Sequence, residues 1–374
     1  MNESYQKWIK QKLEKLQVID CYKAGATSET VAKQLGVTTK QIIKLDFNEN
    51  LFMPRVKQAK LMKDLADEID LRMYPEAEEA KLREKLSGYI KVPKDFIVVG
   101  NASDELIDRI IRLFVEKGDI AVSVAPTFSI PRLCVKRQEG EYVTVPLQKN
   151  LHLDVKGMIS KFSDKTRLLY ICSPNSPTGT QYKAENIEKL VKAFPGIVIL
   201  DEAYGEFADY SFVPRIREFE NMIILRTFSK AFGLAALRLG YVVANPELAK
   251  ILTEKAPLPY PVSGFTLRMG AKMLDNVDMM LESVKQVKTE REKMIKALNE
   301  IEGVQAFDSQ ANFVLMNTQK PFELVNQKLL WKGIMVKKWG KILHYENCFR
   351  VTVGLPEMNA KLVEVLKEIE EADE

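Results

Sequence analysis

The sequence is poor in the residues that build metal centres and disulfide frameworks. Only four cysteines and two histidines occur among its 374 residues. The cysteines, Cys21, Cys134, Cys172 and Cys348, lie far apart and form no CxxC pair. This spacing argues against a zinc site and against a disulfide framework, and so few histidines argue against a histidine-based metal site. We therefore predict no metal site.

Long apolar runs and an excess of one charge are also missing. No uninterrupted apolar run approaches the roughly 18 residues that cross a bilayer. The first residues, MNESYQKWIKQKLEKL, indicate a charged amphipathic helix without the apolar centre of a secretory signal. The net charge of +4 comes from interspersed acidic and basic residues, so no stripe for nucleic acid is evident. We expect a cytoplasmic, soluble protein that binds neither membranes nor nucleic acid.

Short apolar runs alternate with helical patterns between about residues 95 and 245. The runs are FIVVG (96–100), DIAVSV (119–124), RLLYICS (167–173), GIVILDEA (196–203), MIILRT (222–227) and LGYVVAN (239–245). Near-continuous apolar strands separated by helices are typical of a mostly parallel sheet covered on both faces. The sequence therefore predicts an α/β domain.

The region after the proline-rich segment 257–261 differs in pattern. A helical stretch over about 265–300 is followed by ANFVLMN, GIMVKKW and CFRVTVG, and then by a helix rich in Glu and Lys. This order predicts a smaller α+β domain. We expect an N-terminal arm or part of the small domain over 1–48, a large domain over 49–260 and a small domain over 261–374.

Polar residues follow several of the predicted strands, where open parallel sheets collect their ligands. FIVVGNASDELI places Ala102, Ser103 and Asp104 at a helix N-terminus, which fits an anion site or a plain N-cap. VILDEAYGEF ends a buried strand with Asp201 and adds Tyr204. A buried carboxylate is costly unless it meets a cation or a donor, although capping the next turn would also explain it.

The stretch RTFSKAFGLAALRLGY (226–241) places Ser229, Lys230 and Arg238 between two predicted core strands. A Ser-Lys hydrolase dyad fits poorly, because adjacent side chains in an extended segment point to opposite faces. One ligand that contacts all three residues fits better: Arg238 and Ser229 hold a phosphate, and Lys230 forms a Schiff base with an aldehyde. A ring nitrogen on that ligand would explain Asp201. These features indicate pyridoxal 5′-phosphate.

A family resemblance covers nearly the whole chain. The matching stretches are KLDFNEN (44–50), YPE (74–76), GNASDELI (100–107), APTF (125–128), CSPNSPTG (172–179), DEAYGEF (201–207), RTFSKAFGLAALRLGY (226–241), ANFVLM (311–316) and FRVTVG (349–354). Together they resemble the fold-type I pyridoxal-phosphate-dependent aminotransferases, and within that group they are most similar to the histidinol-phosphate aminotransferases. The resemblance implies a large domain with a mostly parallel mixed sheet flanked by helices, and reversible transamination of histidinol phosphate in histidine biosynthesis.

The resemblance also assigns the cofactor contacts. It implies that Lys230 forms the covalent link and moves the substrate's Cα proton, and that Asp201 pairs with the ring nitrogen. Tyr204 hydrogen-bonds the ring's 3-oxygen, and Phe128 stacks on the ring face. The phosphate is assigned to Ser103, Asp104, Ser229 and Arg238.

Further roles concern the substrate and a second subunit. The resemblance implies that Tyr74 reaches the cofactor phosphate of the partner in a homodimer. It implies that Arg350 clamps the anionic end of the substrate, either the carboxylate of glutamate or the phosphate of histidinol phosphate. Tyr22 and Asn48 are expected to line the substrate side.

The sequence departs from the family pattern at three positions. Ser176 stands where the family usually has an Asn that contacts the 3-oxygen, so that contact is lost, bridged by water or taken over by Asn175. Ala102 replaces a common Gly, which is tolerable if its φ is negative. Lys337 stands where relatives often carry a second substrate-binding arginine, and it lacks the bidentate fork of a guanidinium.

Three other functions compete with this prediction. The segment SETVAKQLGVTTKQIIKL (28–45) matches a helix-turn-helix pattern, although it lacks a basic recognition face and further helices. A DNA-binding regulator that senses pyridoxal phosphate is therefore a remote alternative. An O-phosphothreonine decarboxylase and an aromatic or broad-range aminotransferase are closer alternatives, because they share the fold and much of the motif set.

Overall fold

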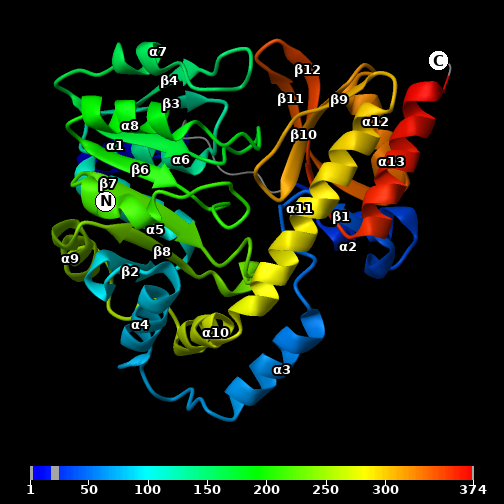
Figure 1. Cartoon of the computed structure of the whole chain (residues 1–374). Coiled ribbons are helices and arrows are strands. Elements are labelled where there is room, and N and C mark those ends of the chain that lie inside the picture. Colours follow the sequence, from blue (N-terminus) through cyan, green and yellow to red (C-terminus); the bar gives the residue numbers. More distant parts are fainter. Residues whose placement is uncertain (1–2, 18–24, 373–374) are drawn as a thin grey trace.

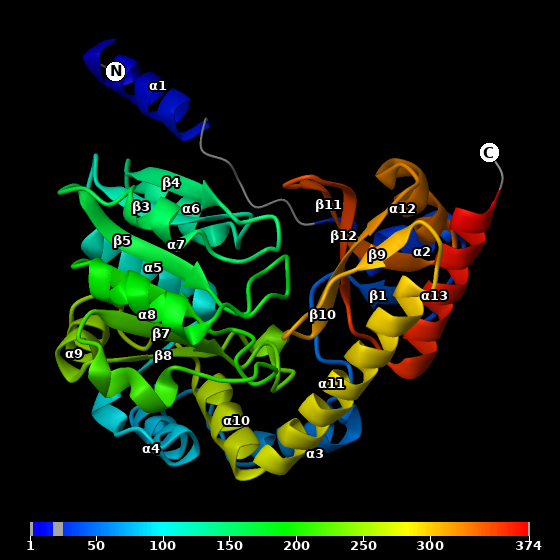
Figure 2. The same ribbon diagram turned by 45° about the horizontal axis from the view of Figure 1, so that its top comes forward.

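A larger α/β unit and a smaller unit lie side by side in the computed structural model, which describes residues 3–17 and 25–372. Helix α11 (Val277–Asn299) runs from beneath the larger unit to the smaller one (Figure 1). Turned by 45°, the molecule again shows the two sheets on opposite sides, with α12 (Phe322–Trp331) and α13 (Pro356–Glu371) beside the smaller sheet (Figure 2).

The larger unit is built on a seven-stranded sheet in the order β2-β8-β7-β6-β5-β3-β4. Its strands are β2 (Ile97–Gly100), β3 (Ile120–Ala125), β4 (Glu141–Pro146), β5 (Thr166–Cys172), β6 (Ile197–Asp201), β7 (Met222–Thr227) and β8 (Gly240–Ala244). Strand β8 is antiparallel to both of its neighbours, and the other pairs are parallel. The parallel strands therefore end at one edge of the sheet.

Helices cover both faces of this sheet, as its continuous apolar strands require. Alternate strand side chains, such as Tyr170 and Ile199, pack in one core with α5 (Ala102–Phe114), α6 (Ile130–Arg137) and α9 (Pro246–Glu254). Their neighbours, such as Leu169 and Val198, pack in a second core with α4 (Glu78–Ile90), α7 (Val155–Ile159), α8 (Ala184–Ala193) and α10 (Gly264–Asp275). The sheet is thus buried on both sides, and only its ends and loops are available for chemistry.

The smaller unit contains a five-stranded sheet in the order β1-β11-β12-β10-β9. Its strands are β1 (Ile43–Leu45), β9 (Val304–Ala306), β10 (Phe313–Thr318), β11 (Ile334–Ile342) and β12 (Tyr345–Thr352). Strand β1 pairs in parallel with β11, in the register Ile43↔Ile334, so the segment before the large domain contributes an edge strand here. The register of β11 with β12 pairs Lys337 with Arg350.

The remaining elements are short or peripheral. They are α1 (Glu3–Gln17), α2 (Ser28–Leu35), α3 (Arg55–Ala66) and the 3-10 turns η1 (Thr39–Gln41), η2 (Lys94–Phe96), η3 (Val213–Glu218) and η4 (Ala235–Leu237). In the helix-turn-helix pattern at 28–45, α2 is followed by a single 3-10 turn and then by β1, so the position of a recognition helix is taken by a sheet strand. Within residues 3–17 and 25–372, no helix has the length and apolarity needed to cross a membrane.

The strands predicted for the large domain match the observed ones to within about two residues. The sequence pattern missed β4, because EYVTVP is an edge strand with half-exposed and exposed positions and does not stand out as an apolar run. The helix predicted over 265–300 is two helices, α10 and α11, which meet at Asn276 with φ −118°. The predicted domain boundaries stay a prediction.

Candidate active site

A cavity of about 250 Å³ lies where the parallel strands of the large sheet end. Its lining comes from the segments that follow β2, β3, β5, β6 and β7, from the segment that precedes β8, and from the small unit. The lining residues are Phe47, Asn48, Ser103, Asp104, Phe128, Ile130, Cys172, Ser176, Asp201, Ala203, Tyr204, Thr227, Ser229, Lys230, Arg238 and Arg350. Most of the residues predicted from the sequence are therefore brought to one place.

Lys230 is placed by the turn that follows β7. Its Nζ donates a hydrogen bond to the carbonyl oxygen of Phe47 at 2.9 Å and lies 5.7 Å from the centre of the Tyr204 ring. Burial, helped by the positive charge of Arg350, lowers the pKa of Lys230 to about 8. A sizeable fraction of the amine is therefore neutral near physiological pH, and the neutral amine is the nucleophile that attacks aldehydes.

Asp201 ends β6 and is only 2% exposed. Its Oδ2 accepts a hydrogen bond from the hydroxyl of Tyr170 at 2.7 Å, and its Oδ1 accepts one from the backbone N–H of Ala203 at 2.9 Å. Burial raises the pKa of this carboxyl to about 6, although both hydrogen bonds act against the rise. The Ala203 bond stabilises the local turn, and a cationic partner inside the cavity would stabilise the charge.

The edge formed by α5 and the segment before β8 carries hydrogen-bond donors that could hold an anion. Asn101, at the N-cap of α5, makes no side-chain capping bond within the described part of the chain, so the first-turn N–H groups stay available for an anion. Arg238 donates to the hydroxyl of Ser229 at 3.4 Å and to the carboxylate of Asp104 at 2.8 Å. A side chain on Gly240 would come within 2.8 Å of the backbone N of Ser103, so this strand start needs glycine.

The backbone conformation of Ala102 differs from the expectation. The replacement of the family's glycine by Ala102 is expected to be tolerable if φ is negative, but φ is +69°. An L-residue with a side chain pays roughly 1–2 kcal/mol for this left-handed conformation. The bend directs the chain from β2 into the first turn of α5, and this turn places Ser103 at the cavity.

Tyr204 and Asn48 form a pair between the two units. The Asn48 side-chain amide donates to the Tyr204 hydroxyl oxygen at 2.9 Å, which leaves the O–H of Tyr204 able to donate to a ligand. Burial raises the pKa of Tyr204 to about 12, so the hydroxyl stays protonated. Asn48, with φ +57°, is held by Thr352, whose hydroxyl accepts from its N–H, and by Asn312, whose amide donates to its carbonyl.

Arg350 reaches the cavity from β12. Its Nη1 donates to the Ser176 hydroxyl at 3.0 Å, and its Nη2 donates to the carbonyl oxygen of Asp46 at 2.7 Å. Ser176 is therefore used to orient the guanidinium, across the boundary between the large and small units. Lys337 lies opposite Arg350 in the register of β11 and β12 and is half-buried. Burial, together with the charge of Arg350, lowers the pKa of Lys337.

Of the described residues that were predicted to bind cofactor or substrate, Tyr74, Asn175 and Lys337 do not line the cavity. The side-chain amide of Asn175 donates to the carbonyl of Pro126, and its oxygen accepts from Thr127, which argues against its predicted contact with the 3-oxygen. Tyr74 is 75% exposed. Tyr22 lies outside the described residues.

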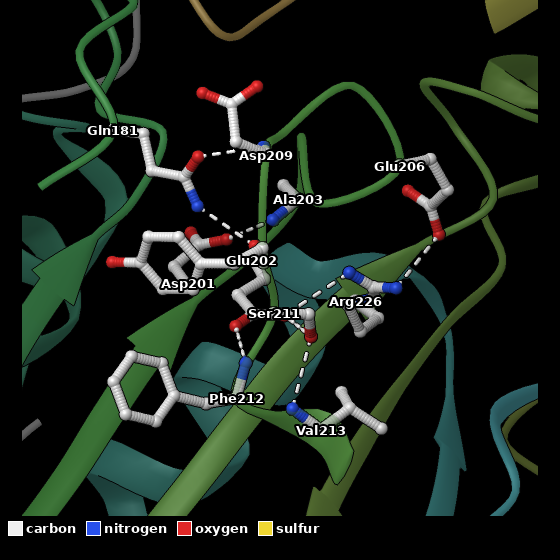
Figure 3. Close-up of polar contacts among 11 residues, drawn as sticks. Gln181, Asp201, Glu202, Ala203, Glu206, Asp209, Ser211, Phe212, Val213 and Arg226 are labelled. Carbon is white, nitrogen blue, oxygen red and sulfur yellow. Dashed lines mark hydrogen bonds and ion pairs between the residues drawn. The ribbon is translucent and has the colours of Figure 1, made fainter. Parts of the chain in front are cut away.

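Sequence reasoning missed a buried ionic network beside Asp201 (Figure 3). Arg226 is 6% exposed, donates to Glu202 at 3.2 Å and lies 3.4 Å from Glu206. A side chain on Gly205 would collide with the guanidinium at 1.7 Å, so glycine makes room for it. The network joins the ends of β6 and β7. The lining residues Cys172 and Thr227 were also missed, although their positions at strand ends could have identified them.

Comparisons with known proteins identify the family and the fold. The sequence profile of the family named aminotransferase class I and II matches residues 40–366. The structure is similar to that of histidinol-phosphate aminotransferase from Sinorhizobium meliloti in complex with pyridoxal-5′-phosphate, with a TM-score of 0.84, 24% identity and coverage of 95% of this chain and 96% of that one. The chain belongs to the class I and II aminotransferases, and the predicted fold is confirmed.

Sequence identity also places the chain in a narrower group within that family. The chain is 36% identical over 331 residues to the histidinol-phosphate aminotransferase of Caldanaerobacter subterraneus subsp. tengcongensis, which is 87% of this chain and 92% of that protein. It therefore belongs with the histidinol-phosphate aminotransferases, as the motifs indicated. The L-threonine-O-3-phosphate decarboxylase of Porphyromonas gingivalis, at 20% identity, a TM-score of 0.76 and coverage of 88% of this chain and 100% of that one, shares the fold alone.

Proposed function

We propose that this protein transfers an amino group between histidinol phosphate and 2-oxoglutarate, with pyridoxal 5′-phosphate as cofactor, as a step in histidine biosynthesis. The observation that carries the proposal is a single cavity lined by Lys230, Asp201, Arg238 and Arg350, in a chain 36% identical to a histidinol-phosphate aminotransferase over 331 residues. The predicted cytoplasmic location stays a prediction.

The residues present fit the cofactor at each of its ends. The partly buried Lys230, whose amine has a lowered pKa, suits the aldehyde of the cofactor. The buried carboxylate of Asp201 would gain a cationic partner in a protonated ring nitrogen. The open N-terminus of α5 with Ser229 and Arg238 suits its phosphate. When bound, the cofactor supplies an electron sink for the pair of electrons left when the Cα proton is removed.

Four side chains of the protein are proposed to move protons or to contact the cofactor ring. With the cofactor bound, Lys230 would act as the base for the Cα proton, since burial lowers the pKa of its amine to about 8. Asp201 holds a proton on the ring nitrogen, and Tyr204 donates to the 3-oxygen. Phe128 packs against the ring.

Arg350 binds the anionic end of each substrate. Its guanidinium is already held by Ser176 and the Asp46 carbonyl, so little side-chain entropy is lost when a carboxylate or phosphate arrives. Lys337 adds a second positive charge beside it in the register of β11 and β12. Asn48 completes the substrate side through its bond to Tyr204.

The active unit in this proposal is a homodimer. Tyr74 stacks on Tyr260 with ring centres 5.0 Å apart. Together with Leu71, Met73 and Leu258 these rings make an exposed apolar surface, with exposed fractions between 52% and 85%. Surfaces of this kind mark contact sites, and a second copy that covers it would carry Tyr74 toward its partner's cavity.

A half-reaction screen tests the substrate. The cofactor-loaded protein is mixed separately with histidinol phosphate, phenylalanine, glutamate and O-phosphothreonine, and the cofactor spectrum is followed. Histidinol phosphate and glutamate should convert the cofactor to its amino form, and phenylalanine should do so far more slowly. Carbon dioxide release from O-phosphothreonine, or faster conversion by phenylalanine, would refute the substrate assignment.

A further inference from the structure

Tyr170 lies behind the predicted ring-binding carboxylate and outside the cavity lining. It stands in the middle of β5 and pairs in register with Ile199, two residues before Asp201 on the neighbouring strand. Side chains at 170 and 201 therefore project from the same face of the sheet as close neighbours. The Tyr170 hydroxyl reaches the carboxylate Oδ2 at 2.7 Å.

The surroundings of this hydroxyl favour a lasting hydrogen bond to Asp201. Tyr170 and Asp201 are 0% and 2% exposed, so solvent does not compete for their hydrogen bond. Burial and the neighbouring carboxylate raise the pKa of Tyr170 well above its ordinary value, and the phenol stays a donor. The strand itself is fixed, since the Ser123 hydroxyl donates to the Tyr170 carbonyl oxygen at 2.8 Å.

We propose that Tyr170 is a positioning residue that keeps the Asp201 carboxylate ionised and aimed into the cavity. This inference rests on the proposed pairing of Asp201 with the ring nitrogen. The Tyr170 hydroxyl occupies Oδ2 from the side of the sheet, and the Ala203 N–H occupies Oδ1, so the carboxylate cannot rotate without losing a bond. A carboxylate that accepts a strong donor holds its own proton less tightly. The proton shared with a ring nitrogen is thereby kept on the ring.

The test compares three variants loaded with cofactor labelled with nitrogen-15 in the ring. Tyr170→Phe removes only the hydroxyl. Tyr182→Phe is the matched control, because Tyr182 is also buried, at 1% exposure, and its hydroxyl makes no hydrogen bond within the described residues. Asp201→Asn tests the pairing on which the inference rests. Nitrogen NMR reports whether the ring nitrogen is protonated, and cofactor release is timed by dilution into a trap.

The expected results distinguish the positioning role of Tyr170 from the pairing of Asp201 with the ring nitrogen. Tyr170→Phe should move the nitrogen resonance from that of a pyridinium toward that of a pyridine and speed cofactor release at least about tenfold, as for the loss of a hydrogen bond to a charged group. Tyr182→Phe should change neither. A folded Tyr170→Phe protein with the wild-type resonance and release rate would overturn the inference. An unchanged resonance in Asp201→Asn would instead overturn the pairing itself.

A second variant covers the case in which Tyr170→Phe does not fold. Replacing Tyr170 with 4-aminophenylalanine keeps the ring and returns a weaker donor at the same place. Its resonance and release rate should lie between those of the wild-type and Asp201→Asn proteins. Values equal to wild type would show that donor strength at this position does not matter, and the inference would fall.

Discussion

Burial of Asp201 predicts that removing its charge stabilises the cofactor-free protein. The pKa of the carboxyl rises from 3.8 to about 6, because the side chain is buried. A folded-state value above the unfolded one means that the folded chain binds the proton more tightly. The contribution of Asp201 to the free energy of unfolding therefore falls as the pH rises from about 4 to about 6, and the loss is complete above that range.

The size of the effect follows from the rise in pKa. Each pKa unit corresponds to about 1.4 kcal/mol, so the ionised carboxylate costs the cofactor-free protein about 3 kcal/mol at neutral pH. Asp201→Asn has no charge to bury, so it should be more stable than wild type by up to about 3 kcal/mol near pH 7.5 and by little near pH 4. Saturating cofactor should reverse the order at neutral pH, since only the carboxylate pairs with a cation.

Denaturant unfolding of the cofactor-free proteins at the two pH values measures this difference. Asp308→Asn is the control, because Asp308 is exposed and the same substitution there removes a charge that is not buried. A stability difference between Asp201→Asn and wild type that is the same at both pH values would refute the reasoning. It would mean that the ionised Asp201 carboxylate does not destabilise the cofactor-free protein.

Three further substitutions have defined outcomes. Ala102→Gly should raise the free energy of unfolding by up to about 1 kcal/mol in a denaturant titration, because φ is +69° there, and a loss of stability would contradict the strain. Arg350→Ala should raise the KM for both anionic substrates at least about tenfold and keep the cofactor's absorbance, whereas an unchanged KM would exclude the clamp. Ser176→Ala removes one bond to that guanidinium, so KM should rise several-fold with kcat nearly unchanged, and a fall in kcat alone would place Ser176 on the cofactor instead.

The sequence predicted the strand ends well, because apolar runs followed by polar residues are a local pattern. Lys230 and Asp201 were found this way, since each interrupts or ends such a run. Tyr170 was not found, because an aromatic residue inside an apolar strand looks like ordinary core. The role proposed for it depends on the register between β5 and β6, which no local pattern specifies.

Contacts between distant segments were equally hidden from the sequence. The bond from Arg350 to Ser176 joins residues on different units, and it explains a substitution that the motif pattern could only mark as a departure. The Arg226 network needs two distant segments to meet, 202–206 and the end of β7. In the sequence, Arg226 looks like a flanking residue of the motif that contains Lys230. The sign of φ at Ala102 depends on the path of the chain from β2 into α5.

The central claim is that Lys230 holds the cofactor covalently in the cavity that Asp201 and Arg238 share. Borohydride reduction of the cofactor-loaded protein, followed by peptide mass spectrometry, tests it directly. The account predicts one phosphopyridoxyl group per chain, on the peptide that contains Lys230, and none on the Lys230→Ala protein. Modification of another lysine in the wild-type protein, or no modification at all, would contradict it.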